Sequence, residues 1–166
     1  MEENAILLKR TARFAGVLYL AWVLTGLYGM MYVPSQTVVQ GDVDATAEKM
    51  LRNEFTFRAG IFNDIISNTI CVFMLLTLYR LFREVNEQQA KLMVALLGVT
   101  IPTAFILDTC SLTSLLLFKG ELMKAMESGM RKELAMLFLR ISEYGAMTLE
   151  MFWGLWLIPF GQLVYN

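Results

Sequence analysis

The chain has 166 residues and a net charge of −1; 57% of its residues are hydrophobic and only 17% are charged, against about 25% charged in a typical globular domain. One soluble core of this size cannot readily bury four apolar runs of about twenty residues or more, so the composition, with a mean hydropathy of +0.53, predicts a membrane protein. The charge balance argues against a nucleic-acid partner, and the lack of histidine removes most zinc and haem sites, so we expect no metal and no cofactor.

The first predicted transmembrane helix covers residues 14–33, directly after Lys9, Arg10 and Arg13. A basic segment followed by an apolar run also marks a signal peptide. This run, however, is longer than a typical signal core and ends in bulky MMYVP instead of a small-residue cleavage site. We therefore expect a retained membrane span.

The next segment, PSQTVVQGDVDATAEKMLRNEF, predicts a short surface helix. Either Asp42 or Asp44 can cap its N-terminus. Its apolar residues recur at helical spacing, which favours a helix lying on the membrane surface: Ala47, Met50, Leu51 and Phe55.

The second and third predicted spans, residues 57–82 and 90–118, are joined by the short connection REVNEQQAK. Such a short connection predicts an antiparallel helical hairpin. Pro102 lies inside the third span, where it removes a helical hydrogen bond, so we expect a kink there.

The connection KGELMKAMESGMRKE predicts another short helix, because its apolar residues fall along one side: Leu122, Met123, Met126 and Met130. A fourth span follows at about residues 133–165. We interpret all four spans as helices, because an isolated strand cannot satisfy its backbone in lipid. The expected fold is therefore all-α, a single membrane domain over residues 1–166 built as a polytopic four-transmembrane-helix bundle with short surface helices in its loops.

The orientation rests on the lysines and arginines near the span ends, whose numbers on the two sides are almost equal. On one side the basic residues directly abut the spans, and on the other side they are mixed with acidic residues. The first set decides the prediction, and its members are Lys9, Arg10, Arg13, Arg80 and Arg83. We therefore expect both termini in the cytoplasm.

Polar residues interrupt three of the predicted spans at similar depths. Asp64 lies about seven residues into the second span, Asp108 about ten from the end of the third, and Arg140 and Glu143 about seven to ten into the fourth. Ionised groups in the apolar layer cost at least about 2.5–3.5 kcal/mol each, so these residues should face the bundle interior and pair. The candidate polar pocket consists of Arg58, Asn63, Asp64, Asn68, Asp108, Arg140 and Glu143.

Two interpretations of this pocket stay open. Buried ion pairs and hydrogen bonds can hold helices together in lipid. Alternatively, intramembrane acids can form a solute pocket or a relay for protons or ions. Four acids, Asp64, Asp108, Glu143 and Glu150, outnumber Arg140 and Arg58, which slightly favours the second interpretation, because at least one carboxyl should then be protonated, cation-bound or solvated.

Three functions fit these residues. The first is a non-enzymatic membrane protein whose intramembrane pocket binds or passes a small solute, ion or lipid group. The second is an assembly or regulatory subunit with a purely structural polar network. The third, a membrane enzyme using Asp64, Asp108 or Glu143 as acid–base groups, is disfavoured by the lack of histidine and of any nucleophile motif. Expected partners are membrane lipids, and either further copies of the chain or another membrane protein.

Four segments carry a resemblance that covers nearly the whole chain: RTARFAGVLYLAW, GDVDATAEKML, FRAGIFNDIISN and FWGLWLIPFGQLVY. In the order and spacing of these four segments, the chain resembles a bacterial family of small multi-pass inner-membrane proteins catalogued as a domain of unknown function. The resemblance implies a location in the bacterial inner membrane. It also implies that Arg58 and Asp64 are recurrent features, without an established catalytic role.

Members of that family usually continue past the last of these segments with further apolar helix, whereas this sequence stops at Asn166. The resemblance therefore implies either a shorter member or a truncated chain. In the second case the polar pocket would lack a wall.

Overall fold

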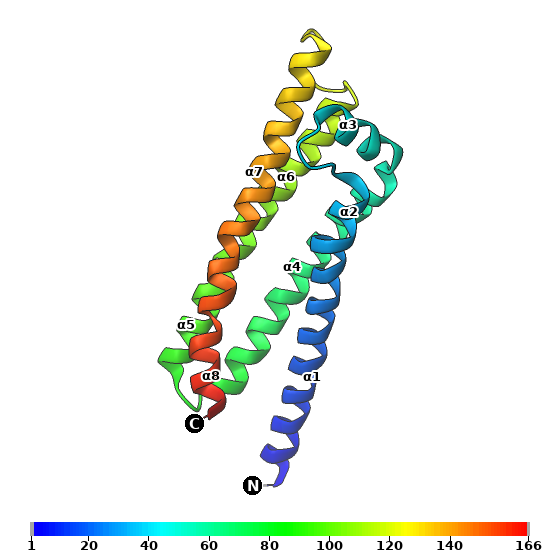
Figure 1. The fold of residues 1–166 in the computed structure, drawn as a ribbon. Coiled ribbons are helices and arrows are strands. Elements are labelled where there is room, and N and C mark those ends of the chain that lie inside the picture. Colours follow the sequence, from blue (N-terminus) through cyan, green and yellow to red (C-terminus); the bar gives the residue numbers. More distant parts are fainter. Residues whose placement is uncertain (1, 166) are drawn as a thin grey trace.

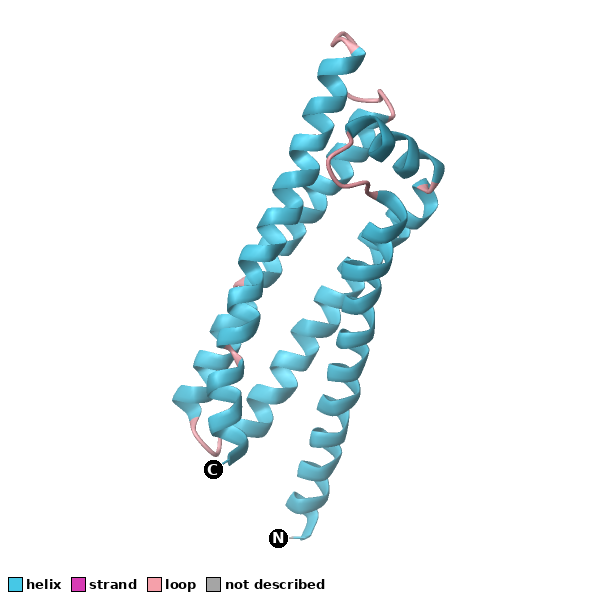
Figure 2. Cartoon of the chain, viewed as in Figure 1, coloured by secondary structure: helices cyan, strands magenta, loops and turns pink. Residues whose placement is uncertain are grey.

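The computed structural model describes residues 2–165, and this part of the chain consists of helices and loops without a strand (Figure 2). The expected all-α class is confirmed, and two predicted helix ends, at Phe82 and Phe118, coincide with ends in the structure. The elements in chain order are α1 (Glu2–Leu27), the π-helix η1 (Tyr28–Tyr32), α2 (Val33–Thr37), α3 (Val43–Arg52), α4 (Glu54–Phe82), α5 (Glu87–Gly98), α6 (Thr100–Phe118), α7 (Ser128–Leu155) and α8 (Leu157–Tyr165).

The long helices lie lengthwise beside one another in an elongated molecule (Figure 1). Helix α1 packs against α4, α6 against α7, and α5 against α8. Both ends of the described chain lie at one end of the molecule, which we call the termini end (Figure 1). Helix α3 and the connection between α6 and α7 lie at the opposite end, which we call the α3 end (Figure 1).

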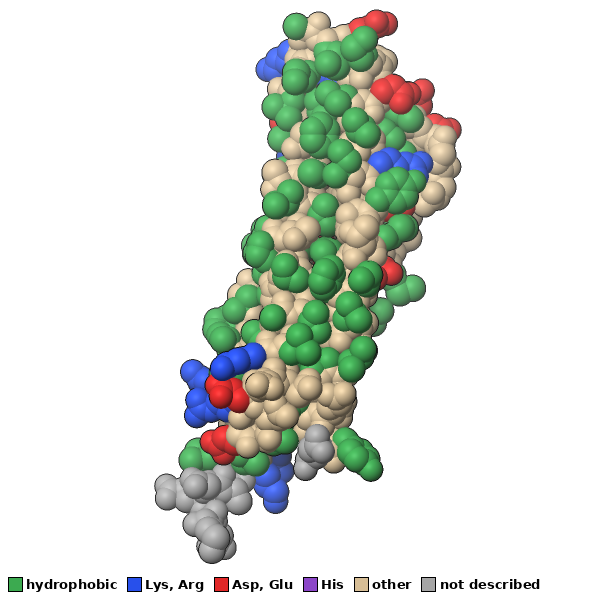
Figure 3. Space-filling view, turned by 90° about the vertical axis from the view of Figure 1, so that its left-hand side faces the viewer, with side chains coloured by type: hydrophobic (Ala, Val, Ile, Leu, Met, Phe, Trp, Pro, Cys, Tyr) green, Lys and Arg blue, Asp and Glu red, His purple; other side chains and the backbone are tan. Residues whose placement is uncertain are grey.

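Three helical segments within the described residues are long and apolar enough to cross a membrane: Ile6–Thr37, Glu54–Phe82 and Glu87–Phe118. They contain the first three predicted spans. The fourth predicted span, in α7 and α8, is not among them, and α7 carries charged residues along its length. Hydrophobic side chains are spread along the flank shown in Figure 3, while most charged side chains gather toward the two ends. These features indicate a membrane protein.

Two prolines explain two breaks in the long helices. A proline ring removes one backbone donor and crowds the carbonyl four residues earlier. Helix α5 ends at Gly98, four residues before Pro102, and α7 ends at Leu155, four residues before Pro159. Near Pro102, where a kink is expected, the structure shows an interruption of the helix at Val99, about one turn before the proline.

The predicted short helix after the first span is confirmed as α3. Asp42 caps it, and not the alternative Asp44: the Asp42 Oδ1 accepts a hydrogen bond of 2.9 Å from the backbone N–H of Ala45. One side of α3 is buried against the bundle through Ala47 and Met50.

The prediction of a short helix in the connection after α6 is wrong. Helix α6 ends at Phe118, and the next α-helix begins only at Ser128. The backbone N–H groups of Gly120 and Glu121 bond to the carbonyls of Leu117 and Leu116, and Gly120 has a φ of +72°. This is a Schellman motif, in which a glycine in the left-handed conformation stops the helix. The spacing of the methionines favours a helix, but the glycine ends it.

The buried apolar side chains form two separate clusters. The termini-end core consists of Ala15, Cys71, Met74, Leu75, Leu78, Ala90, Met93, Leu97, Ile101, Trp156 and Leu163. The α3-end core consists of Val33, Ala47, Met50, Phe57, Leu115, Leu117, Phe118, Ala135, Met136 and Leu139. Each long helix therefore has a middle stretch that belongs to neither core.

Candidate functional site

The middle stretches of the long helices carry polar side chains, and together they form what we call the polar layer. On α4, for example, the α3-end core contributes Phe57 and the termini-end core resumes at Cys71, with polar residues between them. The same interval exists on α1, α6 and α7. The polar layer consists of Thr25, Asn63, Asp64, Ser67, Asn68, Asp108, Ser111, Arg140, Ser142 and Glu143.

Hydrogen bonds join α1 to α4 within this layer. The hydroxyl oxygens of Thr25 and Ser67 are hydrogen-bonded at 3.0 Å. The Asn63 side-chain amide donates to the backbone carbonyl of Thr25 at 2.9 Å. Ser67 is buried, so its bond to Thr25 satisfies a polar group that would otherwise be costly. These contacts set the relative position of the two helices beside Asp64.

Asp64 lies directly against the π-helix η1. Its Oδ1 accepts a long hydrogen bond of 3.4 Å from the Asn63 amide. A Cβ atom built on Gly29, in η1, would overlap this same carboxylate oxygen. The carboxylate therefore fits at this position only because residue 29 has no side chain. A short π-helix such as η1 is rare, and such elements are frequently found at functional sites.

Asp108 on α6 is the second acid of the layer. Its Oδ2 is buried and has no hydrogen-bond partner among residues 2–165. Asp64 lies near enough to Asp108 for their charges to interact. The packing of two helix pairs thus brings together two carboxyl groups that are far apart in the sequence. An unsatisfied buried carboxylate oxygen is costly, so a proton, a cation or a donor group would stabilise it.

Helices α6 and α7 are joined beside Asp108 by another pair of hydroxyl groups. The hydroxyl oxygens of Ser111 and Ser142 lie 2.8 Å apart. Leu107 packs directly on Gly145, where an added Cβ would overlap a leucine methyl. These contacts hold α6 and α7 close together on either side of Asp108 in the sequence.

Arg140 and Glu143 interact with each other on α7. The Arg140 Nη1 lies 3.9 Å from the Glu143 Oε2, and it also donates to the Tyr144 hydroxyl at 3.4 Å. The two charged side chains are 30% and 33% exposed. Arg140 is thus engaged within its own helix.

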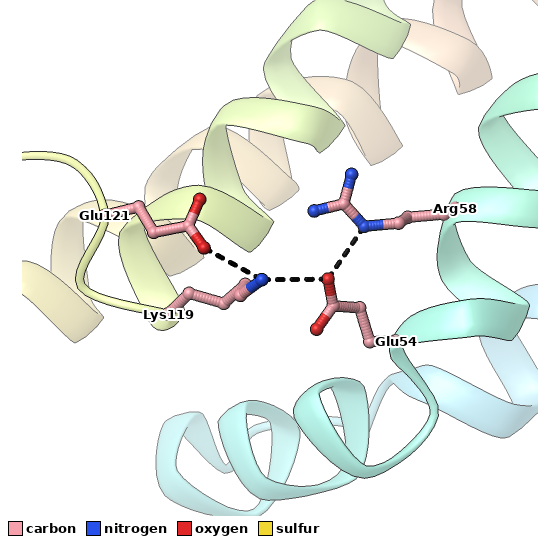
Figure 4. Close-up of polar contacts among 4 residues, drawn as sticks. All are labelled: Glu54, Arg58, Lys119 and Glu121. Atoms are coloured by element: carbon pink, nitrogen blue, oxygen red, sulfur yellow. Dashed lines mark hydrogen bonds and ion pairs between the residues drawn. The ribbon is translucent and has the colours of Figure 1, made fainter.

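Arg58 belongs to a different group of charges at the α3 end, shown in Figure 4. Its Nε lies 2.7 Å from the Glu54 carboxylate, which also accepts from Lys119 at 3.0 Å. Lys119 in turn lies 2.8 Å from Glu121. Hydrogen bonds to Glu121 and Glu54 raise the pKa of the Lys119 ammonium. This network links the start of α4 to the end of α6.

The structure therefore separates the residues that the sequence offers as one pocket. Asn63 and Asn68 bond to Asp64, the latter by donating its amide to the Asp64 backbone carbonyl at 2.9 Å, and Asp108 lies near enough to Asp64 for their charges to interact. Neither Arg58 nor Arg140 forms an ion pair with Asp64 or Asp108 in the described part of the chain: Arg58 pairs with Glu54, and Arg140 contacts Glu143, another acid of the predicted pocket.

Three further residues of the site are not found by reading the charges alone. Thr25 and Ser67 are ordinary residues in apolar spans, and Gly29 gains its meaning only from the carboxylate packed on it. Small and polar residues recur along α4 at steps of four, four and three residues: Gly60, Asp64, Asn68 and Cys71. Such a line of small and polar residues signals a close helix partner, but not which helix supplies it. For metals, no group of three or more possible protein ligands converges within residues 2–165.

Comparison with known proteins places the chain by its sequence. No curated protein and no solved structure matches it. A family model does match, and it covers residues 14–166, which include every helix from the middle of α1 onward. The chain therefore belongs to the family described as a domain of unknown function, DUF4386.

Proposed function

We propose that the chain is a multi-pass protein of the bacterial inner membrane in which the polar layer binds or passes a small solute, most favourably a small cation. The observation that carries this proposal is the placement of Asp64 and Asp108 between two apolar cores. Their carboxyl groups interact, and neither has a basic partner among the described residues.

The fourth span of this proposal is formed by α7 and α8. Helix α7 lies along α6, and α8 packs on α5, so both follow a segment that is itself apolar enough to cross a membrane. Charged residues inside a transmembrane helix are tolerated where they face the bundle and pair. The contact between Arg140 and Glu143 supports this arrangement.

Charge is the physical reason to prefer a positively charged ligand. Each ionised carboxylate in an apolar layer costs at least about 2.5–3.5 kcal/mol, and two close carboxylates also repel each other. A proton or a small cation that binds between Asp64 and Asp108 removes both costs. The amide of Asn63 and the hydroxyl groups nearby can supply further oxygen or donor atoms.

The substitution Asp64→Asn tests the proposal in detergent-purified protein. Thermal unfolding is measured from pH 5 to pH 8 in sodium, potassium or N-methylglucamine chloride at one ionic strength. We expect the midpoint of the wild type to depend on pH or on the small cation, and Asp64→Asn and Asp108→Asn to lose this dependence with nearly unchanged stability. Glu150→Gln, which removes an exposed acid of α7, should behave as the wild type. A dependence that persists in both aspartate variants would contradict the proposal.

An assembly or regulatory subunit is the alternative, favoured by the hydroxyl pairs Thr25–Ser67 and Ser111–Ser142, which join helices without needing a ligand. A purely structural Asp64 would be needed to compensate a buried arginine. Its loss would then cost about 3–5 kcal/mol and be restored in part by Arg140→Gln. That result would favour the structural role over the cation site.

Both termini are proposed to lie in the cytoplasm. They lie at the same end of the molecule (Figure 1), and the basic residues Lys9 and Arg10 follow closely after the N-terminus in the sequence. A cysteine placed at the exposed Glu48 of α3 should therefore react with a membrane-impermeant maleimide in intact cells. The native Cys71 is buried and Cys110 is half-buried, so the wild type provides the background. Labelling that occurs only after lysis would invert the orientation.

A further inference from the structure

A hollow of about 540 Å³ lies at the termini end, between the start of α1 and the last turns of α4. One part of its wall is apolar and includes Leu7, Phe14 and Leu81. The other part carries charged groups: Arg10 from α1, Arg80 from the end of α4, and Glu84 from the turn that follows α4. The hollow therefore has an apolar side and a predominantly basic side.

The two arginines of this hollow have no acidic partner in the described structure. Neither the Arg10 nor the Arg80 guanidinium forms an ion pair or a side-chain hydrogen bond with another of residues 6–165. Among residues 6–165, Glu84 is the one acidic side chain in the wall, so two positive charges face one negative charge. The hollow therefore favours an anion over a neutral or cationic group.

The position of the hollow places it at the boundary between lipid and water. Arg10 lies four residues inside the start of the candidate span Ile6–Thr37, and Arg80 lies two residues before the end of Glu54–Phe82. Phe14 is 56% exposed and Leu7 is 55% exposed, so apolar surface continues from the hollow along the outside of the helices. Lipid headgroups and the first part of their acyl chains occupy this depth.

We propose that this hollow binds the phosphate headgroup of an anionic phospholipid. The guanidinium groups of Arg10 and Arg80 hold the phosphate, for which arginine provides several donors in a fixed plane. The acyl chains lie along Phe14 and Leu81. An inorganic phosphate ion shares the headgroup chemistry but makes no use of the apolar wall. Basic hollows between transmembrane helices are suited to anionic headgroups for the same reason.

Native mass spectrometry of the full chain tests this site. The protein is purified in dodecyl maltoside and titrated with dioleoyl phosphatidylglycerol or, separately, with dioleoyl phosphatidylcholine or inorganic phosphate. The double variant Arg10→Gln/Arg80→Gln is compared with Arg13→Gln/Arg83→Gln, which removes the same charge at the same end from residues that do not line the hollow. We take about 5-fold in binding as the contribution of each arginine that contacts the headgroup, the size of the attraction between one basic residue and an anionic membrane surface.

We expect phosphatidylglycerol binding to fall about 25-fold in the Arg10/Arg80 variant. The loss should be clearly smaller in the Arg13/Arg83 variant, because those residues do not line the hollow. Glu84→Gln removes the opposing acid and should strengthen binding, a gain that misfolding cannot mimic. Equal losses in both double variants would show non-specific attraction and overturn the proposal. It is also overturned if phosphatidylcholine binds as tightly as phosphatidylglycerol, or if inorganic phosphate alone displaces the lipid.

Discussion

Gly60 provides a sharp test of how closely α4 approaches the start of α2. A Cβ atom built on Gly60 would lie 2.8 Å and 2.9 Å from the two methyl groups of Val33 and 3.3 Å from its Cβ. Both residues are buried, and Val33 belongs to the α3-end core. A valine in a helix keeps essentially one side-chain rotamer, so these methyl groups cannot turn away. The substitution Gly60→Ala must therefore push the helices apart.

The size of the effect follows from two opposing contributions. Replacing glycine with alanine inside a helix stabilises it by about 0.8–1 kcal/mol. Inserting a methyl group into a closely packed contact costs about 1–3 kcal/mol. Gly16 in α1 is the matched control, because a Cβ atom added there would meet nothing within 4 Å, so that only the favourable contribution applies. The free energy of unfolding of Gly60→Ala should therefore be about 1–3 kcal/mol below that of Gly16→Ala.

Thermal unfolding of the detergent-purified variants measures this difference. For a chain of this length, 1 kcal/mol corresponds to about 2–4 °C, so the two midpoints should differ by about 2–12 °C. In a double-mutant cycle, Val33→Ala removes the obstructing methyl groups and should cost less in the Gly60→Ala background than in the wild type. Equal midpoints for Gly60→Ala and Gly16→Ala would refute the close contact.

Two further predictions concern the polar layer and the α3 end. Gly29→Ala should displace the Asp64 carboxylate and abolish the pH or cation dependence of unfolding. The control Gly26→Ala should preserve this dependence, because a Cβ atom added at Gly26 meets no atom within 4 Å. If Gly29→Ala retained the dependence, the carboxylate would not be held against residue 29. The pKa of Lys119 is raised in the folded state, so its stabilisation is fully present below its unfolded pKa of about 10.4 and is lost as the pH rises through the folded value. The midpoint difference between the wild type and Lys119→Ala should therefore be larger at pH 8 than at pH 11, and a constant difference would contradict a role for the lysine charge.

Local chemistry makes much of the helical architecture predictable. Long apolar runs define the spans, because only a helix satisfies the backbone in lipid. The break before Pro102 and the cap at Asp42 depend on residues within one helical turn of them. The wrong prediction after α6 has a local cause as well: the spacing of the methionines favours a helix, but Gly120 is a stop signal in the same segment, and its left-handed conformation prevails.

The pairing of charges is less predictable, and Arg58 shows why. Its distance along α4 from Asp64 is only six residues, yet its guanidinium points to Glu54 and so belongs to the network with Lys119. Helical periodicity gives the face on which a side chain lies. A long and flexible arginine can reach any of several partners from that face, so the neighbour that arrives from another helix decides the pairing.

By itself, the sequence determined that this is a helical membrane protein with acids inside its apolar segments, because hydropathy, helix length and proline positions act over a few residues. Only the tertiary structure decided that the core divides into two clusters with a polar layer between them, that Asp64 packs on Gly29, and that Asp64 lies near enough to Asp108 for their charges to interact. Those contacts join residues from η1, α4 and α6. They depend on how closely and in what register the helices pack, and this is set by the fit of many side chains at once, which no single segment encodes.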